Sequence, residues 1–381
     1  MAVVSLTIEQ FLEKRTGGPV LDVRSPGEYS HARIPGAYPL PLFNDEERKV
    51  VGTAYKQESR EKAIKIGLDY FGPKMRPMVE EVEALLGKKR SAGAADAGVP
   101  GNNSKATDGT ATGALSSVGG PLPAGGPAKE VLVHCWRGGM RSGGVAWLLD
   151  LYGFRVYTLK GGYKAFRQWV LAQLSAEWPM KVLGGYTGSG KTDLLQRLVR
   201  LGEAVIDLEA LAHHRGSAFG HLGQAAQPSQ EQFENELALQ LHALKGRPFW
   251  VEDESMRIGN ILLPQRFEQQ LRTAPCYFLD IPFEKRLDYL VPAYGGFDRE
   301  KLITAILRIQ KRLGGLETKQ AVNCIVENDT RSAFAILLKY YDKWYAKSLK
   351  SRGDAPVVNI PLEAVDETRN SQQILSLCPS N

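Results

Sequence analysis

Short apolar runs alternate with longer amphipathic segments along this chain, which is the pattern of buried strands connected by helices. The apolar runs lie at residues 20–23, 131–133, 180–183, 204–206, 248–251 and 276–281. Continuous apolar strands are typical of parallel sheets that helices cover on both faces. We therefore predict an α/β fold with parallel sheets, in which the strands at 20–23 and 131–133 lie parallel to each other.

Two changes in this pattern divide the chain. Residues 91–129 are dominated by Ala, Gly, Ser, Pro and Asn and contain no aromatic residue, so they cannot bury enough apolar surface to fold. We predict that they form a disordered insertion in the first domain. An amphipathic helix at residues 163–170 is followed by Trp178-Pro179 and a new strand. Because 381 residues exceed what one core ordinarily holds, we predict two domains, at 1–175 and 176–381.

The composition is that of a globular protein, with 43% hydrophobic and 24% charged residues. The chain has neither a run of about eighteen apolar residues nor a signal-peptide pattern at its start, so we expect a cytoplasmic protein without a membrane segment. Four scattered cysteines without metal-ligand spacing fit a reducing compartment. The net charge of +6 permits an acidic partner such as RNA but does not require one.

The turn after the second apolar run carries the most informative chemistry. Cys135 ends that strand, and two glycines and two arginines follow before a helix-compatible run at 144–149. Helix N-terminal amides and cationic side chains stabilise a thiolate, so we predict that Cys135 is a nucleophile. The residues predicted to hold an anion beside it are Arg137, Gly138, Gly139, Arg141 and Ser142. The alternative is a buried, inert cysteine.

A second anion site is predicted where the strand at 180–183 leads into a glycine-rich turn and a helical run. Residues 185–192 match the phosphate-loop pattern GxxxxGK[ST] in the strand-loop-helix context that it requires. Its glycines let backbone amides surround phosphate oxygens, the lysine adds a charge, and the threonine adds a hydroxyl for an oxygen or Mg²⁺. The residues predicted to bind the phosphates are Gly185, Gly188, Ser189, Gly190, Lys191 and Thr192.

Further polar residues are expected near this loop. Ligands gather at the carboxyl ends of parallel strands, so Asp207, Glu252 and Asp253 are candidate pocket residues, whereas we expect Asp280 to be structural. Acids at strand ends also cap helices, and for Asp253 a metal-related role and a capping role both stay open. Residues 211–221 are predicted to form a loop that lines the pocket, with Arg215 as a phosphate contact.

Two other sequence features give weaker evidence about function. The adjacent His213 and His214 would point apart on a helix and have no third ligand at useful spacing, so we predict no metal site. The run at 299–313 has an apolar side and a basic side. Its basic side fits an ordinary solvated surface or an RNA contact equally well.

Together these residues resemble the tRNA 2-selenouridine synthase family. The resemblance rests on residues 22–24, 34–37, 135–142, 185–192, 214–220 and 251–255, and it spans nearly the whole chain apart from the insertion. It implies a rhodanese-like parallel-sheet domain followed by a doubly wound domain like those of P-loop NTPases, with a helical C-terminal part. The chain departs from the family in its long insertion and at Ala54, where some relatives carry a cysteine, which puts a relay between two cysteines in doubt.

The resemblance implies a transferase that modifies the wobble uridine of tRNA in two steps. A geranyl group from geranyl diphosphate is transferred to the sulfur of 2-thiouridine, and selenium from selenophosphate then replaces the S-geranyl group. The phosphate loop would bind the diphosphate without ATP hydrolysis. Cys135 would take selenium from selenophosphate as a selenosulfide. The implied partners are a tRNA with 2-thiouridine and a supplier of selenophosphate, with no tightly bound cofactor, although Mg²⁺ is compatible with the loop.

Two other classes of function fit parts of the chain. The spacing from His134-Cys135 to Arg141-Ser142 also matches the phosphocysteine loop of phosphatases, some of which share the rhodanese fold. Such enzymes usually need a carboxylic acid as general acid, and this loop contains none. The other rival is a sulfurtransferase or binding module fused to a P-loop kinase, which would hydrolyse ATP or transfer its phosphoryl group.

Overall fold

The computed structural model describes residues 3–94, 129–350, 352–353 and 355–378. The chain forms two compact units, Met1–Phe166 and Arg167–Asn381, which divide within helix α7 (Gly162–Ser175), nine residues before the predicted boundary at 175. Residues 91–94 of the predicted insertion continue helix α5 (Met75–Ala94), and residues 95–128 lie outside the described part. Among the described helices, none has the length and apolar character needed to cross a membrane.

The first unit is built on a five-stranded sheet with the strand order β1-β5-β4-β2-β3, in which all neighbours are parallel. The strands are β1 (Val4–Leu6), β2 (Val20–Asp22), β3 (Tyr38–Pro39), β4 (Glu130–His134) and β5 (Arg155–Leu159). The predicted parallel pairing of the first two apolar runs is confirmed, since β2 and β4 are neighbours with Asp22 opposite His134. β4 occupies the centre of the sheet and leads directly into the cysteine turn.

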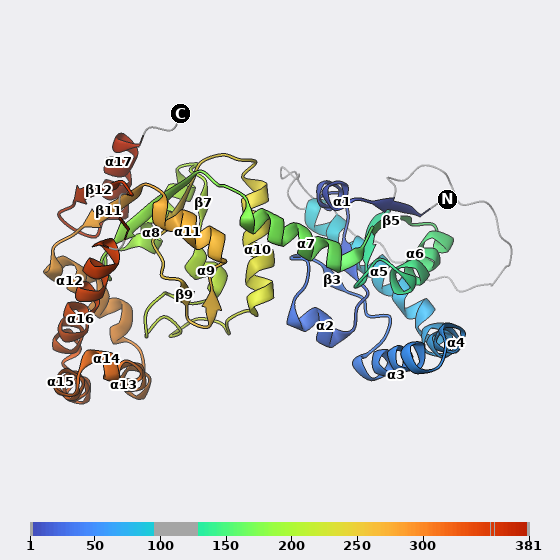
Figure 1. Ribbon diagram of the computed structural model, residues 1–381, viewed down its shortest axis with the longest axis horizontal. Coiled ribbons are helices and arrows are strands. Elements are labelled where there is room, and N and C mark those ends of the chain that lie inside the picture. Colours follow the sequence, from blue (N-terminus) through green and yellow to red (C-terminus); the bar gives the residue numbers. More distant parts are fainter. Residues whose placement is uncertain (1–2, 95–128, 351, 354, 379–381) are drawn as a thin grey trace, which may run out of the picture. The chain divides into compact units, whose positions relative to one another are not determined.

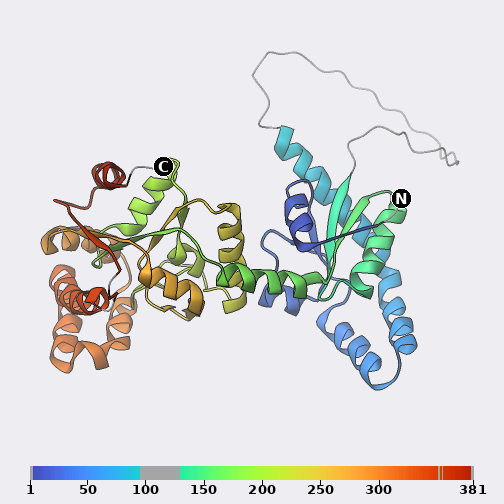
Figure 2. The ribbon, with the colours of Figure 1, turned by 45° about the horizontal axis from the view of Figure 1, so that its top comes forward.

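Helices cover this sheet and supply its core. They are α1 (Ile8–Lys14), α2 (Pro26–His31), α3 (Asp45–Gln57), α4 (Arg60–Phe71), the short 3-10 helix η1 (Gly72–Lys74), α5, α6 (Met140–Tyr152) and the start of α7. α6 contains the predicted helical run, and its Val145 and Leu149 are fully buried against Val131 and Val133 of β4. α3 and α4 form a helical hairpin at one end of the unit (Figure 2). The sheet therefore fixes where α6 begins, directly after the cysteine turn.

The second unit contains a second parallel sheet, with the order β12-β11-β6-β8-β7. Its strands are β6 (Met180–Gly185), β7 (Val205–Ile206), β8 (Phe249–Glu252), β11 (Cys276–Asp280) and β12 (Val357–Pro361). The predicted strands at 180–183, 204–206, 248–251 and 276–281 are all present in it. A short antiparallel hairpin, β9 (Arg257–Ile258) with β10 (Ile261–Leu262), follows β8. The strand that precedes the phosphate loop, β6, lies at the centre.

Helices of the second unit flank the sheet and form a separate layer beyond it. They are α8 (Lys191–Arg200), α9 (Leu208–Ala212), α10 (Gln230–Ala243), α11 (Gln265–Thr273), α12 (Phe283–Gly295), α13 (Arg299–Arg308), α14 (Gln310–Leu313), α15 (Gly315–Val326), α16 (Thr330–Lys350) and α17 (Glu367–Leu377). Helices α12 to α16 gather on one side of the sheet (Figure 1) and enclose their own apolar core. The amphipathic run at 299–313 forms two of these helices, with Leu302, Ile306 and Leu313 buried.

Candidate functional site

The cysteine loop connects the central strand of the first sheet to α6 and places a thiol below an exposed turn. Cys135 is 3% exposed, whereas the residues of the turn that follow it are exposed. The turn needs glycine at position 138, where φ is +64° and an added Cβ atom would lie 2.6 Å from the carbonyl oxygen of Leu159. α6 starts at Met140, so its N-terminal amides face the loop. The sequence-predicted residues Gly138, Gly139 and Ser142 are thus gathered around the sulfur.

Hydrogen bonds hold the pKa of the Cys135 thiol below its ordinary value. Burial disfavours the thiolate, but hydrogen bonds from the Ser142 hydroxyl and from the backbone amides of Ser142, Arg137 and Gly139 outweigh burial and lower the pKa. The Ser142 Oγ lies 3.2 Å from the sulfur, and it also donates to the Gly139 carbonyl oxygen at 3.1 Å. One hydroxyl proton serves one acceptor at a time, so it is available to the sulfur when the thiol ionises. This environment favours the thiolate.

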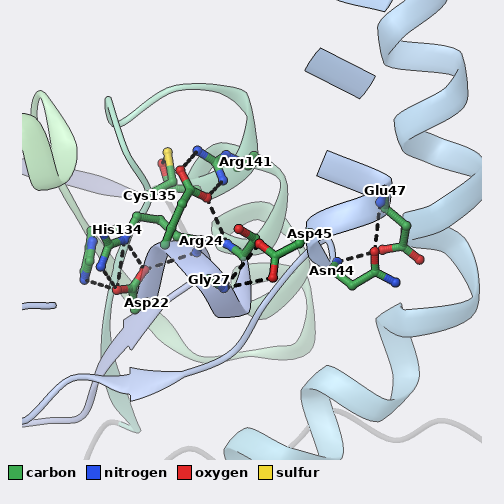
Figure 3. Close-up of polar contacts among 12 residues, drawn as sticks. Asp22, Arg24, Gly27, Asn44, Asp45, Glu47, His134, Cys135 and Arg141 are labelled. Carbon is green, nitrogen blue, oxygen red and sulfur yellow. Dashed lines mark hydrogen bonds and ion pairs between the residues drawn. The ribbon is translucent and has the colours of Figure 1, made fainter. Parts of the chain in front are cut away.

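The two arginines of the loop have different surroundings. Arg137 is exposed at the turn. Arg141, in the first turn of α6, makes a two-point ion pair with Glu28 of α2, with Nη1–Oε2 at 2.6 Å and Nη2–Oε1 at 3.2 Å. Burial works against the Glu28 carboxylate, but the Arg141 guanidinium and the Ser25 amide keep the Glu28 pKa below its ordinary value. Arg141 therefore reaches the loop with its guanidinium oriented by a carboxylate (Figure 3).

Asp22 at the end of β2 and Arg24 just after it lie beside the end of β4, from which the cysteine loop begins. Asp22 and Arg24 are fully buried and paired, with Nη2–Oδ2 at 2.6 Å, and the guanidinium lies 3.9 Å from the centre of the Tyr163 ring. His134 is buried beside them, 3.7 Å from Asp22, and neither of its ring nitrogens has a hydrogen-bond partner among the described residues. Burial lowers the His134 pKa, which favours the neutral ring. These residues support the loop and do not contact its opening.

The phosphate loop of the second unit lies between β6 and α8, in the strand-loop-helix order that the motif requires. Gly190 caps α8 with φ of +70°, and α8 begins at Lys191. Glycine is also needed at position 188, where φ is +81° and a Cβ atom would lie 2.8 Å from the side chain of Leu290 on α12. The loop amides therefore precede the positive end of the α8 dipole, where anions bind favourably.

Lys191 and Thr192 are held by contacts within the second unit. The Lys191 Nζ donates to the carbonyl oxygen of Gly185 at 2.8 Å, and the Thr192 hydroxyl donates to Glu209 of α9 at 3.1 Å. Glu209 lies beside the buried Glu254, where burial and the neighbouring carboxylate raise the Glu254 pKa well above its ordinary value. The raised pKa favours the protonated, neutral form of Glu254 beside the carboxylate of Glu209.

Two of the predicted pocket acids accept hydrogen bonds from backbone amides instead of lining the pocket. Asp207 is the N-cap of α9, and its side chain accepts a hydrogen bond from the Ala210 amide at 2.7 Å. Glu252 is buried at the end of β8 and accepts from the Glu209 amide at 2.7 Å, while its other oxygen has no hydrogen-bond partner among the described residues. Burial raises the Glu252 pKa well above its ordinary value. Neither side chain lines the cavity at the phosphate loop.

Asp253 lines the cavity at the phosphate loop, as predicted, and forms ion pairs there. Its carboxylate is buried and pairs with Arg352 at 2.7 Å and with Arg272 at 3.2 Å. It caps none of the described helices, and a metal-related role stays a prediction. Asp280, expected to be structural, accepts a hydrogen bond from Asn359 of the neighbouring strand at 3.1 Å.

A cavity of about 520 Å³ opens beside the phosphate loop, a volume typical of small-molecule sites. Gly188, Ser189, Gly190, Lys191 and Thr192 of the loop line it. Arg215 also lines it, as predicted from the stretch after α9, together with Arg312 of α14. The cavity thus combines a loop built for phosphate with further arginines, and four acidic residues also line it: Asp193, Glu209, Asp253 and Glu254.

Six aromatic side chains also line this cavity, which the sequence patterns did not predict. The rings are Tyr289 and Tyr294 of α12 and Tyr340, Tyr341, Trp344 and Tyr345 of α16. Tyr289 donates a hydrogen bond to Asp193 of α8 at 2.8 Å, which ties α12 to the helix that follows the phosphate loop. The four α16 residues recur at helical spacing, so a helical projection could have shown that they share a face. Which cavity that face lines is decided by tertiary packing.

Comparisons with known proteins give a consistent result. A family model described as the tRNA 2-selenouridine synthase AAA domain matches residues 178–374. A tRNA 2-selenouridine synthase of Sulfurovum sp. (strain NBC37-1) is 33% identical over 94% of this chain and 91% of the relative. The enzyme of the same name from Shewanella pealeana (strain ATCC 700345 / ANG-SQ1) is 32% identical over 88% of this chain and 90% of the relative. A third, from Pseudomonas putida (strain GB-1), is 31% identical over 91% and 94% respectively.

Proposed function

Since this chain belongs to the tRNA 2-selenouridine synthase family, we propose that it converts wobble 2-thiouridine in tRNA to 2-selenouridine by geranyl transfer and then selenium transfer. Family membership makes the chain a transferase that modifies tRNA. The observation that carries the proposal is a cavity lined both by a phosphate loop and by six aromatic side chains. Such a lining fits a ligand that carries a diphosphate and a hydrocarbon group.

In the first step the sulfur of 2-thiouridine attacks the first carbon of geranyl diphosphate, and the carbon–oxygen bond to the diphosphate breaks. The bridging oxygen takes the electron pair of the broken bond, so the leaving diphosphate gains one negative charge, which the loop amides, Lys191 and Arg215 can stabilise. The uridine N3 loses its proton as the sulfur is alkylated. Positive charge that develops on the allylic carbon is stabilised by the faces of nearby aromatic rings.

The chemistry of the loop is also compatible with Mg²⁺. Thr192 and Glu209 offer two oxygen atoms at 3.1 Å from each other, and Mg²⁺ prefers oxygen ligands from one or two protein groups together with phosphate oxygens. Bound Mg²⁺ would supply additional positive charge for the leaving diphosphate. We propose no tightly bound organic cofactor.

In the second step selenium from selenophosphate replaces the S-geranyl group. Alkylation turns the sulfur into a better leaving group, and a selenium nucleophile that attacks C2 of the base expels geranylthiolate. We assign selenophosphate to the cysteine loop because its turn offers backbone amides, the exposed Arg137 and the oriented Arg141 around a stabilised thiolate. The reaction takes place in the cytoplasm, where a selenophosphate-forming enzyme would supply this substrate.

We assign the first unit to the rhodanese-like class. Its all-parallel sheet places the cysteine turn after the central strand and before a helix, so that strand and helix together position the loop. The residues after β2 that carry the family resemblance form the buried Asp22–Arg24 pair below the loop. Their contribution to function is thus to hold the shape of the loop.

The test is mass spectrometry of tRNA nucleosides from cells that lack this protein, complemented with the wild type, Cys135→Ala or Lys191→Ala. We expect Cys135→Ala to accumulate S-geranyl-2-thiouridine without 2-selenouridine, because only the second step needs the thiol. We expect Lys191→Ala to lack both nucleosides. Cys324→Ala and Lys181→Ala are the controls, both in the second unit, since Cys324 lies outside the cysteine loop and Lys181 lies against Trp250.

Two results would contradict the proposal. Normal 2-selenouridine in the Cys135→Ala cells would remove Cys135 from the reaction. ATP hydrolysis by the purified protein that is lost in Lys191→Ala, with no binding of geranyl diphosphate, would instead favour a kinase-like second unit.

A further inference from the structure

The electron balance of selenophosphate cleavage constrains what Cys135 attacks. Phosphorus in selenophosphate has the oxidation state of phosphate, and selenium that of selenide. Attack of a thiolate on selenium forms a selenosulfide, in which selenium is oxidised by two electrons, and those electrons stay on phosphorus and yield phosphite. Release of phosphate by that route needs an oxidant. Attack on phosphorus needs none.

We propose that the Cys135 thiolate attacks the phosphorus of selenophosphate, forms an S-phosphocysteine and releases hydrogen selenide. This inference rests on the proposed function, which brings selenophosphate to the cysteine loop. In the first step an S–P bond forms, the P–Se bond of monoprotonated selenophosphate breaks, and selenium leaves with the electron pair and that proton as HSe⁻. Water then attacks phosphorus, the S–P bond breaks, and dihydrogen phosphate and the Cys135 thiolate are released. The hydrogen selenide attacks C2 of the S-geranyl base.

The geometry of the loop suits an attack on a tetrahedral phosphoryl group. The thiol lies at the floor of a turn, and the five residues between Cys135 and Arg141 surround the space above it. Amides of Arg137 and Gly139 point to the sulfur, so an oxyanion seated there meets donors on several sides. Arg141 is held in place by its two-point contact with Glu28, and its guanidinium adds positive charge near Cys135 that attracts phosphoryl oxygens (Figure 3).

The lack of a general acid in the loop distinguishes selenide release from ester cleavage. Residues 135–142 contain no Asp or Glu, and the nearest paired carboxylate, Glu28, is held in its ionised form by Arg141. An alkoxide or phenolate leaving group needs a proton from such an acid. The hydroselenide ion, HSe⁻, is a much weaker base than an alkoxide or phenolate, so it departs without a further proton. The loop therefore fits a phosphoryl donor with a weakly basic leaving group.

Ser142 has a separate role in the second step. Its hydroxyl lies 3.2 Å from the sulfur and can donate to the thiolate as the S–P bond breaks. Without that donor the thiolate is a poorer leaving group, so hydrolysis of the phosphocysteine slows. Replacement of Ser142 by Ala should therefore make the intermediate accumulate.

The experiment mixes the full-length protein with selenophosphate, without tRNA or geranyl diphosphate, denatures it rapidly and analyses the Cys135 peptide by mass spectrometry. A phosphoryl adduct and a selenium adduct have nearly equal masses, but only the second shows the selenium isotope pattern and is removed by dithiothreitol. We expect a thiol-resistant phosphoryl adduct on Cys135, severalfold more abundant in Ser142→Ala than in the wild type. Cys324, in the same digest, should stay unmodified, and circular dichroism checks that the variant is folded.

A selenium adduct, phosphite in solution, or no adduct in either protein would overturn the inference. These outcomes are separable from those of the proposed function. If cells still make 2-selenouridine while phosphite appears, the proposed function stands and the phosphocysteine fails. If the phosphocysteine forms while tRNA stays unmodified, the loop chemistry stands and the tRNA assignment fails.

Discussion

Arg141 and Glu28, 113 positions apart in the chain, form a two-point ion pair beside the Cys135 loop, with N–O distances of 2.6 and 3.2 Å. The pair joins the first turn of α6 to α2, so the loop arginine has a fixed orientation. It also offsets the positive charge of the guanidinium near the sulfur. The carboxylate therefore sets both the direction and the strength of the electric field at the thiol.

Glu28→Gln should lower the Cys135 pKa further. The amide can still accept a hydrogen bond from the Ser25 amide, but it no longer neutralises Arg141, so the thiolate gains a stronger cationic neighbour. The pH dependence of thiolate ultraviolet absorbance, measured as the difference from Cys135→Ser, checks this. Glu47→Gln is the control, because Glu47 pairs with Lys74 away from the loop. A Cys135 pKa that is higher in Glu28→Gln would contradict the electrostatic role of the pair.

Gly138→Ala should damage the cysteine loop, whereas Gly139→Ala should be tolerated. At position 138 φ is +64° and a Cβ atom would lie within 3.1 Å of three backbone atoms, but at position 139 nothing lies within 4 Å. We expect Gly138→Ala to lower the free energy of unfolding by about 1–3 kcal/mol, the usual cost of such a strained residue. Urea unfolding of both variants measures this difference in the free energy of unfolding. Equal stability of the two variants would show that the turn relaxes without cost.

Asp253→Ala should destabilise the second unit strongly. The Arg352 side chain is only 1% exposed, and its guanidinium lies 2.7 Å from the buried Asp253 carboxylate. The substitution would leave this guanidinium without that partner. Breaking a buried ion pair from one side costs about 3–5 kcal/mol, because an uncompensated charge stays in the interior. Glu268→Ala removes a more exposed partner of Arg272 and should cost less than about 1 kcal/mol. Thermal unfolding compares the two, and similar losses would argue against the buried pair as the cause.

Glu252→Gln should stabilise the protein above pH 4.5, with a gain that grows as pH rises. Burial raises the folded-state pKa of Glu252 well above the value of 4.5 expected when unfolded. Between the two values the unfolded chain releases a proton that the folded chain retains, so stability falls as pH rises. Glutamine carries no such proton and can still accept from the Glu209 amide. Urea midpoints at several pH values test this, and a gain independent of pH would exclude the protonation mechanism.

Much of the architecture was predictable because local sequence patterns determine local structure. Apolar runs placed the central strands of both sheets, and glycine-rich turns placed the two anion-binding loops after β4 and β6. Short or weakly apolar strands at sheet edges, such as β3 and β12, carried no comparable signal, because an edge strand is stabilised by its neighbour as much as by its own sequence.

The sequence by itself determined the phosphate-loop motif and the family and predicted Cys135 as the nucleophile, since each depends on residues close together in the chain. Only the tertiary structure showed that Glu28 orients Arg141, that Asp253 is a partner of two arginines, and that α12 and α16 line the phosphate-loop cavity with aromatic rings. These relationships join residues far apart in sequence. The burial of a side chain and its ion-pair partners depend on the neighbours that tertiary packing brings to it, and a local sequence pattern does not identify those neighbours.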